Sequence, residues 1–359
     1  MRTINFYVLH PKCKDVKTAL EYLFLEDLKD KYDFVWNPVN PDYVIATEHL
    51  YASRGTDWYK IFLNLLKIKP ITIFFAGEAM EPDFNIFDYA VGYSSRLSHG
   101  DRYALFPSCF LWANRRGFIN KYENNIKTDE DVNQELEQKK GFCNFLYSNY
   151  MAHPNRDLLF YIISKYKKVD SLGRHLNNVG KKGTGYVGHA MDCIGIKNSY
   201  KFSISSENAQ FCGYTSEKIL TSLEAHTVPI YWGDPDIELN INPDCFINCN
   251  KFNNLEEVVE KIREVDENDE LWKHMVSAPW RTAAQITYHQ ERMANYINLF
   301  NHIFTQEKEA ARRKAEGTMP EIYKSSFERI KLPSNNKILL LIRAFYNKLK
   351  YIYSFRKYV

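Results

Sequence analysis

Residues 201–252 constrain the fold of this chain more than any other segment. Phe202 and Ile204 indicate a strand, and Gly213 indicates a turn that leads into a helix with polar and charged residues in its first turns. The apolar run at 228–232 predicts a second strand directly after that helix. A strand–turn–helix–strand unit with polar groups at the helix N-terminus is how α/β folds bind anionic ligands. The segment therefore predicts an α/β domain with an anion site.

The composition sets the scale of the protein and excludes some partners. A chain of 359 residues, 45% hydrophobic and 25% charged, is long enough and apolar enough for two globular domains. A net charge of +3 is too small to argue for nucleic acid. The seven scattered cysteines favour a reducing compartment and show no zinc-ligand spacing. Residues 1–15 lack the features of a secretory signal, so we expect a cytoplasmic protein, soluble or peripheral to a membrane.

Strand and helix signals alternate through the first part of the chain. The expected strands are 4–9, 34–36, 43–46, 71–75 and 87–92, and the expected helices are 17–31 and 58–66. This alternation predicts an α/β domain over 1–135 with a mainly parallel sheet.

The same alternation resumes after the polar stretch 121–140, which we interpret as a linker with a short exposed helix. We expect strands at 142–148 and 169–170, helices at 156–166 and 255–267, a helical run over 272–304 and a glycine-rich loop at 173–185. A second domain over 136–305 follows from this pattern.

The rest of the chain, 306–359, is expected to form a helical basic tail. Residues 337–359 contain no acidic residue, and apolar side chains recur there at helical spacing. Such a basic amphipathic helix either lies on an anionic membrane surface or packs on the protein body with its basic face in solvent.

A nucleotide sugar is one anionic ligand that suits the predicted anion site. Transfer of its sugar needs cations at the leaving diphosphate and a carboxylate base at the acceptor hydroxyl. Lys218 and Arg156 lie at the starts of predicted helices and suit the cationic role. Glu78 follows the buried strand 71–75 at its carboxyl end, where α/β proteins bind their ligands. Each residue alone is as readily explained by an exposed surface or a helix cap, so the chemistry needs support from their combination.

That support comes from a set of motifs in a fixed order. The segment 207–218 reads EN-x5-Y-x2-EK and is followed by HTVPIYWGDP at 226–235 and CFIN at 245–248. Further matches are FFAGE at 74–78, FNIFDYAVGY at 84–93, DRY at 101–103, the segment 149–156 with Asn149, Pro154 and Arg156, and KKVDSLGR at 167–174. In this order the motifs resemble the α-1,3/4-fucosyltransferases, and most closely the bacterial enzymes that make Lewis antigens. The resemblance covers about 71–252.

The resemblance implies the GT-B architecture, an α/β fold with two Rossmann-like domains facing a central cleft. It also implies transfer of L-fucose from GDP-fucose, with inversion, to a hydroxyl of N-acetylglucosamine or glucose. The acceptor would be a glycan such as a LacNAc-type or lipopolysaccharide O-antigen chain. No metal or other cofactor is expected, because cations of the protein would neutralise the diphosphate.

Residue roles follow from the positions that match the family motifs. Glu78 corresponds to the general base, and Glu217 to the carboxylate beside the fucose ring. The positions expected to bind the donor are Arg156, Lys218, Asn208, Tyr214, Glu207, Ser216 and Arg174. The positions expected to shape the acceptor site are His99, Asp101 and Arg102. For Arg174 a solvated loop position, and for Asp101 a turn or cap, are equally plain interpretations.

The chain departs from the family pattern at a few positions. Ala79 replaces an asparagine after the expected base, Ser216 replaces the usual threonine, and 94–100 lacks acidic residues. The nearest match to a metal-binding Asp-x-Asp motif is 234–236, which we interpret as a turn because Gly233 and Pro235 punctuate it. Three alternatives stay open: a transferase for another nucleotide sugar, a non-catalytic nucleotide- or glycan-binding scaffold, and a structural protein of the membrane surface.

Overall fold

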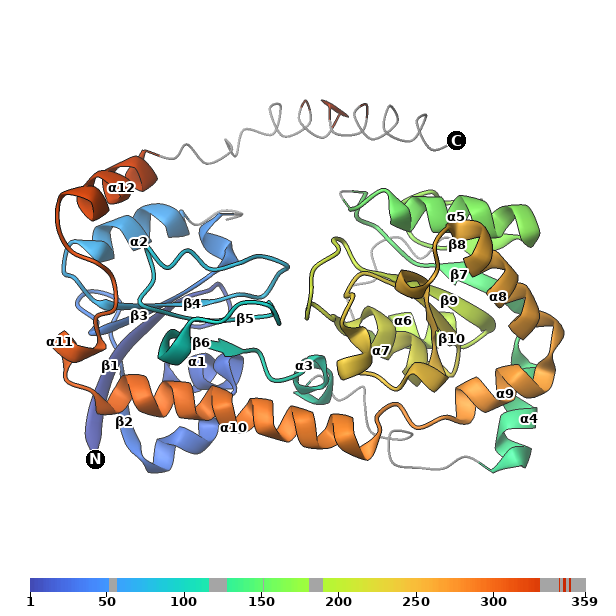
Figure 1. Ribbon diagram of the computed structural model, residues 1–359, viewed down its shortest axis with the longest axis horizontal. Helices are drawn as coiled ribbons and strands as arrows, with labels where there is room; N and C mark the ends of the chain where they lie inside the picture. The colour runs from blue at the N-terminus through green and yellow to red at the C-terminus, as the bar shows by residue number, and fades with distance from the viewer. Residues whose placement is uncertain are drawn as a thin grey trace. The chain divides into compact units, whose positions relative to one another are not determined.

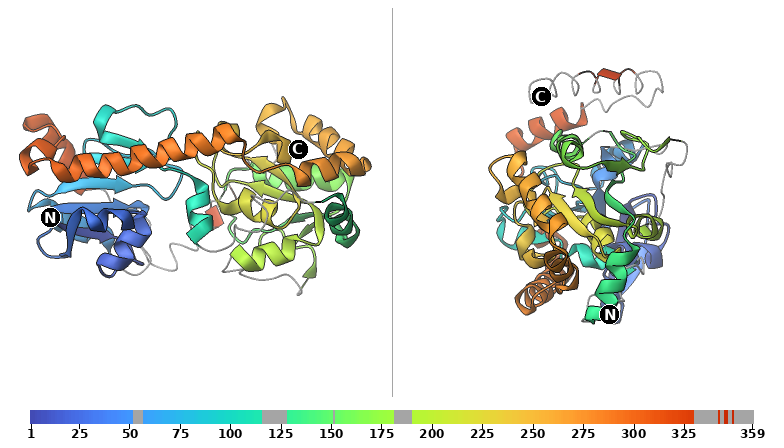
Figure 2. Two further views of the ribbon diagram at one scale, coloured as in Figure 1. Left: turned by 90° about the horizontal axis from the view of Figure 1, so that it is seen from below. Right: turned by 90° about the vertical axis from the view of Figure 1, so that its right-hand side faces the viewer.

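The computed structural model describes residues 1–51, 57–115, 128–150, 152–180 and 190–329, and the tail residues Ile342, Phe345, Tyr346 and Leu349. The chain forms two compact units (Figure 1). Unit 1 is built mainly from Met1–Phe106 and Glu291–Arg343, and unit 2 mainly from Pro107–Gln290. Figure 2 shows the helices of each unit packed around its own sheet.

These bounds differ from the expected domains 1–135, 136–305 and 306–359, and packing explains the difference. The helix α3 (Cys109–Arg115) buries Phe110 in the same core cluster as Ile219 of unit 2. The helix α10 (Ala283–Thr305) places Phe304 edge-on against Tyr43 of unit 1, with ring centroids 5.2 Å apart. The chain therefore enters unit 2 earlier, and returns to unit 1 earlier, than composition indicated.

Unit 1 contains a six-stranded sheet in the order β2-β1-β3-β4-β5-β6, with every neighbouring pair parallel. The strands are β1 (Arg2–Leu9), β2 (Tyr32–Trp36), β3 (Tyr43–Thr47), β4 (Ile71–Phe75), β5 (Tyr89–Gly92) and β6 (Tyr103–Leu105). β3, β4 and β5 are buried along their whole length, as expected for parallel strands covered on both faces.

The helices of unit 1 cover both faces of this sheet. They are α1 (Val16–Leu23), α2 (Trp58–Leu66), the later part of α10, α11 (Lys308–Ala311) and α12 (Thr318–Glu328). Phe62 of α2 shares a core cluster with Val44, whereas Phe304 of α10 packs on Tyr43. Because successive strand residues point to opposite faces, α2 and α10 lie on opposite sides of β3.

Unit 2 contains a five-stranded parallel sheet in the order β11-β10-β9-β7-β8. The strands are β7 (Gly141–Phe145), β8 (Val169–Ser171), β9 (Tyr200–Ser206), β10 (Val228–Trp232) and β11 (Ile247–Asn248). Its helices are α3, α4 (Asp129–Gln138), α5 (Asn155–Tyr166), α6 (Ala190–Lys197), α7 (Glu217–Glu224), α8 (Leu255–Glu267) and α9 (Asp269–Ser277).

Both sheets follow the same strand order, in which the second strand of the unit lies outside the first. In a doubly wound sheet ligands bind at the carboxyl ends of the strands, where the winding direction reverses. That point lies between β1 and β3 in unit 1 and between β7 and β9 in unit 2. The expected pair of Rossmann-like domains is therefore confirmed.

Two expected helices are shorter than predicted. The helix expected at 17–31 ends at Leu23, because Phe24 adopts a left-handed conformation with φ 54°. The backbone N–H of Leu25 then bonds to the carbonyl of Leu20 at 3.0 Å and closes the helix. The run expected over 272–304 is two helices, α9 and α10, with Pro279 between them.

Other elements confirm the sequence interpretation, and a few were missed. The ranges of α2, α8, β4 and β10 agree with the predicted ones. The short β6 and the helices α3 and α6 were not foreseen. Most of the predicted tail 337–359 lies outside the described residues. Among the helices that the structure describes, none is both long and apolar enough to span a bilayer.

Candidate active site

The carboxyl edge of the unit 2 sheet holds a buried ion pair. Glu207 follows β9, is fully buried, and accepts the Ser216 backbone N–H at 2.8 Å. Its other carboxylate oxygen accepts both the Ser216 hydroxyl and the Lys218 ammonium, each at 2.8 Å. Ser216 Oγ also receives a bond from Lys218 Nζ at 2.9 Å. The carboxylate thus fixes the start of α7 and the cation on its first turn.

The charge of Lys218 is kept by its neighbours. Burial alone would lower the pKa of this lysine, but the charges of Glu207 and Glu217 and the hydrogen bond to Glu207 raise it well above its usual value. Glu217 is the first residue of α7 and is partly exposed. A carboxylate at this position is also stabilised by the helix dipole. The edge therefore presents a permanent cation beside an ionisable carboxylate.

A buried aspartate shapes the loop before α7. Asp234 accepts the Gly213 N–H at 2.7 Å, the Thr215 hydroxyl at 2.8 Å and the Asp236 N–H at 2.8 Å. Gly213 has a φ of 86°, which glycine adopts without strain. The interpretation of 234–236 as a turn is confirmed, and Tyr214 is held buried within the loop.

Gly233 is required by close approach to the ion pair. A Cβ at this position would lie 2.5 Å from Cγ of Glu207, and its φ is 152°. Only glycine allows β10 to end directly against the Glu207 side chain.

Arg156 lies on the first turn of α5 and is entirely buried. Its guanidinium donates to Oδ1 of Asn208 at 3.2 Å and to the carbonyl of Asn149. The same group lies over the ring of Tyr147, 4.4 Å from the centroid. Tyr147 in turn accepts the Ser206 N–H at 2.7 Å. Arg156 and Asn208 therefore belong to one network around the end of β9, and in this structure Arg156 has no accessible surface.

Two residues near this network, Asp157 and His175, were missed in the sequence. His175 Nε2 lies 2.6 Å from the buried Asp157 carboxylate, and His153 stacks on Trp232 with ring centroids 4.6 Å apart. The neighbouring Arg174 is exposed. The adjacency of Asp157 to Arg156 was the available signal, whereas nothing in the sequence pairs His175 with a residue 18 positions away.

In unit 1 the expected base Glu78 follows β4 at the carboxyl edge of the sheet. It is exposed and lies in a turn in which the Met80 N–H bonds to the Glu78 carbonyl at 2.8 Å. The preceding Gly77 N–H donates to the Glu48 carboxylate at 2.9 Å. Sequence reasoning missed Glu48, which follows the neighbouring strand β3.

The three acceptor candidates lie at the other end of the sheet. His99, Asp101 and Arg102 precede β6, at the amino ends of the parallel strands, whereas Glu78 follows β4. Arg102 donates to the backbone carbonyls of Phe84, Phe87 and Asp88 at 2.8–3.0 Å.

Asp101 also has partners within unit 1. Its carboxylate lies 2.6 Å from a guanidinium nitrogen of Arg313 and 3.0 Å from Nε2 of His302. The His99 ring packs edge-on against Phe84, with centroids 4.0 Å apart. These contacts are those of residues that anchor a loop.

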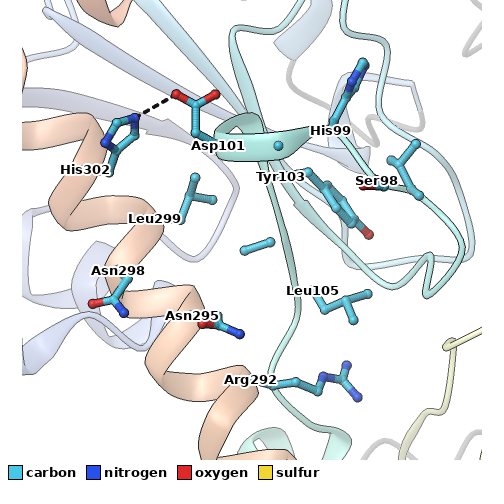
Figure 3. A pocket seen from close by; sticks show the side chains of 13 residues that line it. Ser98, His99, Asp101, Tyr103, Leu105, Arg292, Asn295, Asn298, Leu299 and His302 are labelled. Carbon is cyan, nitrogen blue, oxygen red and sulfur yellow. Dashed lines mark hydrogen bonds and ion pairs between the residues drawn. The ribbon is translucent and has the colours of Figure 1, made fainter.

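A cavity of about 440 Å³ lies between the segment around β6 and helix α10 (Figure 3). His99, Asp101 and Tyr103 line it from the first side, and Asn295 and Asn298 from α10. Of the three acceptor candidates, His99 and Asp101 thus border this cavity.

Across the described residues, no three His, Cys, Asp or Glu side chains come together as a metal site would require.

Family models match both parts of the chain. The model described as "Glycosyltransferase family 10 (fucosyltransferase) C-term" matches residues 136–323, and the "Alpha-(1,3)-fucosyltransferase FucT N-terminal domain" matches residues 13–112. The second match lies almost wholly in unit 1, and it extends the agreement with the family to residues 13–70, which the motifs at 71–252 did not reach.

Curated relatives and solved structures agree with these matches. The chain is 29% identical to the alpha-(1,3)-fucosyltransferase FucT of Helicobacter pylori over 223 residues, 53% of this chain and 43% of the relative. It is 30% identical to human GDP-fucose protein O-fucosyltransferase 3 over 156 residues, 42% of this chain and 32% of the relative. The chain thus spans less than half the length of these relatives.

The fold is shared with solved α1,3-fucosyltransferases. The match with one such structure covers 86% of this chain and 93% of the solved chain, with a TM-score of 0.64 and 22% identity. The match with another, crystallised with GDP-fucose, covers 83% of this chain and 91% of the solved chain, with a TM-score of 0.61 and 22% identity. The GT-B fold class expected from the sequence is confirmed. With a family model matching just over half of its length, and the motif at 207–218 inside that match, the chain belongs to glycosyltransferase family 10, the fucosyltransferases.

Proposed function

We propose that this protein transfers L-fucose from GDP-fucose to a hydroxyl of N-acetylglucosamine or glucose in a glycan, as an inverting α-1,3-fucosyltransferase. The observation that carries the proposal is the Glu207–Ser216–Lys218 network at the carboxyl edge of the unit 2 sheet. It keeps a cation and the N-terminal amides of α7 at the place where doubly wound sheets bind nucleotides.

On the donor side, Lys218 and the first N–H groups of α7 bind the diphosphate. They stabilise the negative charge that develops on the leaving GDP. Arg156 adds a second cation when its contact with Asn208 opens, and until then it holds Asn208 in place. Tyr214 and Arg174 complete the donor site as contacts of the nucleotide.

On the acceptor side, Glu78 acts as the general base. It accepts the proton of the attacking hydroxyl while the new bond forms from that oxygen to C1 of fucose. The bond between C1 and the phosphate oxygen breaks in the same step, GDP leaves with the electron pair, and the configuration at C1 inverts. Glu217 stabilises the positive charge that develops on the fucose ring.

The reaction needs no metal in this proposal, because Lys218 and the α7 amides neutralise the diphosphate. Activity in excess EDTA should equal activity without it. Loss of activity that added Mn²⁺ restores would contradict metal independence.

The decisive experiment is incubation with GDP-fucose and type 1, type 2 and lactose acceptors, with products analysed by NMR. A new α-linked fucose at the 3-hydroxyl of N-acetylglucosamine or glucose is expected. A Ser/Thr-containing peptide acceptor belongs in the panel, because one relative is a protein O-fucosyltransferase by name. Transfer of fucose to the peptide alone would show that the acceptor is a peptide and not a glycan.

Two further measurements on the same protein test the alternative functions. A thermal-shift screen with GDP, UDP, CDP and dTDP identifies the nucleotide, and stabilisation by UDP alone would favour a different donor sugar. GDP binding without hydrolysis of GDP-fucose and without transfer to any acceptor would favour the non-catalytic scaffold.

The acceptor glycan is proposed to be a LacNAc-type or lipopolysaccharide O-antigen chain. Its outer sugars would occupy the cavity that His99 and Asp101 line. Arg102 would serve this site indirectly by holding the loop that carries Phe84.

We place the protein on the cytoplasmic face of a membrane through residues 337–359. Ile342, Phe345, Tyr346 and Leu349 are helical and exposed, at the spacing of one helix face. Co-sedimentation with anionic liposomes, compared with a variant lacking 337–359, tests this. Equal sedimentation of both proteins would contradict it.

A further inference from the structure

Glu48 links the ends of two neighbouring strands in unit 1. It follows β3 directly, and β3 pairs with β4 so that Thr47 lies opposite Phe75. This register places the Glu48 carboxylate beside the chain that leaves β4, where it accepts the Gly77 N–H at 2.9 Å. The next residue along that chain is Glu78.

The approach between Glu48 and Gly77 is as close as a glycine permits. A Cβ on residue 77 would lie 2.8 Å from both carboxylate oxygens of Glu48. The contact in this geometry therefore requires a residue without a side chain at position 77.

The Glu48 side chain is itself held in position by the ends of β1 and β3. Its carboxylate lies 3.3 Å from Nδ1 of His49, and the Thr47 hydroxyl also lies 3.3 Å from that nitrogen. Thr47 Oγ1 donates to the Leu9 carbonyl at 3.1 Å. The His49 ring packs edge-on against His10, with centroids 4.5 Å apart. Three neighbouring strand ends thus meet around one carboxylate.

Glu48 remains ionised at neutral pH. Burial alone would raise its pKa, but hydrogen bonds from His49 and from the backbone N–H groups of Glu48 and Gly77 lower it below the usual value. An ionised carboxylate forms a stronger bond to a backbone N–H than a neutral group does.

We propose that Glu48 is a positioning residue that fixes the Gly77–Glu78 turn and so aims the Glu78 carboxylate at the acceptor hydroxyl. The inference rests on the proposed role of Glu78 as the base. It accounts for an exposed side chain that must nonetheless hold a set direction, since small displacements of a catalytic group cost much of its effect.

The first test compares Glu48→Ala with Glu48→Gln. The alanine variant should lower kcat for transfer about 10- to 100-fold. Its KM for GDP-fucose and its GDP affinity by calorimetry should change less than twofold, about the scatter of such measurements. The glutamine variant keeps an oxygen that accepts the Gly77 N–H, so its loss should stay within about fivefold. Glu321→Ala, which removes an exposed carboxylate from α12 in the same unit, is the control.

A second test approaches the contact from Gly77. Gly77→Ala should push the flexible Glu48 carboxylate away and reproduce the kcat loss with little change in thermal stability. Combined with Glu48→Ala it should add little, because both variants remove one contact. Equal activity of Gly77→Ala and the parent protein would overturn the proposal, even if Glu48→Ala failed to fold.

A third test separates this inference from the assignment of the base. In a Glu78→Gln background, Glu48→Ala should have no further effect on transfer measured with enzyme in excess. Additive losses would show that Glu48 acts independently of Glu78 and would refute the positioning role. Near-parental activity of Glu78→Gln alone would refute the base instead.

Discussion

The two sheets carry the same pair of residues at equivalent positions but use it differently. Glu48 follows the third strand of unit 1 and contacts Gly77 after the fourth, and Glu207 follows the third strand of unit 2 and contacts Gly233 after the fourth. Glu207 is fully buried and is paired with Lys218, whereas the Glu48 side chain is 18% exposed and is paired with a histidine.

The difference matches what each edge would have to bind. A diphosphate is the same in every turnover, so a donor site gains from charges fixed before the ligand arrives. The unit 2 edge has this character, with Lys218, Glu207 and Arg156 locked in hydrogen bonds. An acceptor hydroxyl needs one carboxylate in the open, and unit 1 presents the exposed Glu78 on a short turn.

The largest effect is expected for Glu78, the proposed base in unit 1. Glu78→Gln removes the proposed base and should lower kcat by roughly 10²- to 10⁴-fold. GDP affinity by calorimetry should be unchanged, because the proposed donor contacts lie in unit 2. Glu81→Gln, three residues along the same loop, is the matched control and should keep parental activity. Turnover of Glu78→Gln at a near-parental rate would remove Glu78 from the mechanism.

The next effect concerns stability on the donor side. Glu207→Ala leaves the Lys218 ammonium without its carboxylate in a largely buried site, and breaking such a pair costs about 3–5 kcal/mol. Because the Lys218 side chain is 18% exposed, we expect the lower end of this range. The measurement is denaturant unfolding followed by tryptophan fluorescence, with Glu260→Ala on α8 as the exposed control. A fall in the unfolding free energy of less than 1 kcal/mol would mean that the Glu207–Lys218 pair does not stabilise this edge of the sheet.

The contrast between the two edges also explains what the sequence could reveal. The Glu207–Ser216–Lys218 network lies within 207–218, where a turn and a helix start bring nearby residues together, so local signals located its members. The Glu48–Gly77 contact joins residues 29 positions apart. It depends on the register between β3 and β4, which no local pattern encodes.

The errors in the fold have similar local causes. The leucines after residue 23 continue a helical pattern, but the left-handed Phe24 ends α1. Phenylalanine rarely adopts a positive φ, so the sequence gives no signal for this helix end. The three-residue β6 was too short to detect. Without it, the sequence could not show that Asp101 and Arg102 precede a strand and so lie at the amino edge of the sheet.

A third prediction concerns Lys218, the cation that is proposed to bind the donor diphosphate. Lys218→Ala should weaken GDP binding about 10- to 100-fold, since a hydrogen bond to a charged group contributes roughly 1.5–3 kcal/mol. Calorimetry should be run well below the unfolding temperature, because the variant also leaves Glu207 unpaired. Lys168→Ala removes an exposed lysine that pairs only at the surface with Asp170 and should bind GDP normally. Unchanged GDP affinity in Lys218→Ala would exclude this lysine from the site.

The smallest effect decides whether Arg102 contacts the acceptor or supports the loop. Arg102→Ala leaves three carbonyls of 84–88 without their donor. Each such loss costs about 1 kcal/mol, less where water can enter, so the unfolding free energy should fall by about 1–2 kcal/mol. The acceptor KM should stay within twofold of the parent, because in this interpretation the guanidinium touches only protein. Arg312→Ala, which removes one exposed bond to the Lys69 carbonyl, is the control for stability. A raised acceptor KM with unchanged stability would instead make Arg102 a direct contact of the acceptor, beside the cavity that His99 and Asp101 line.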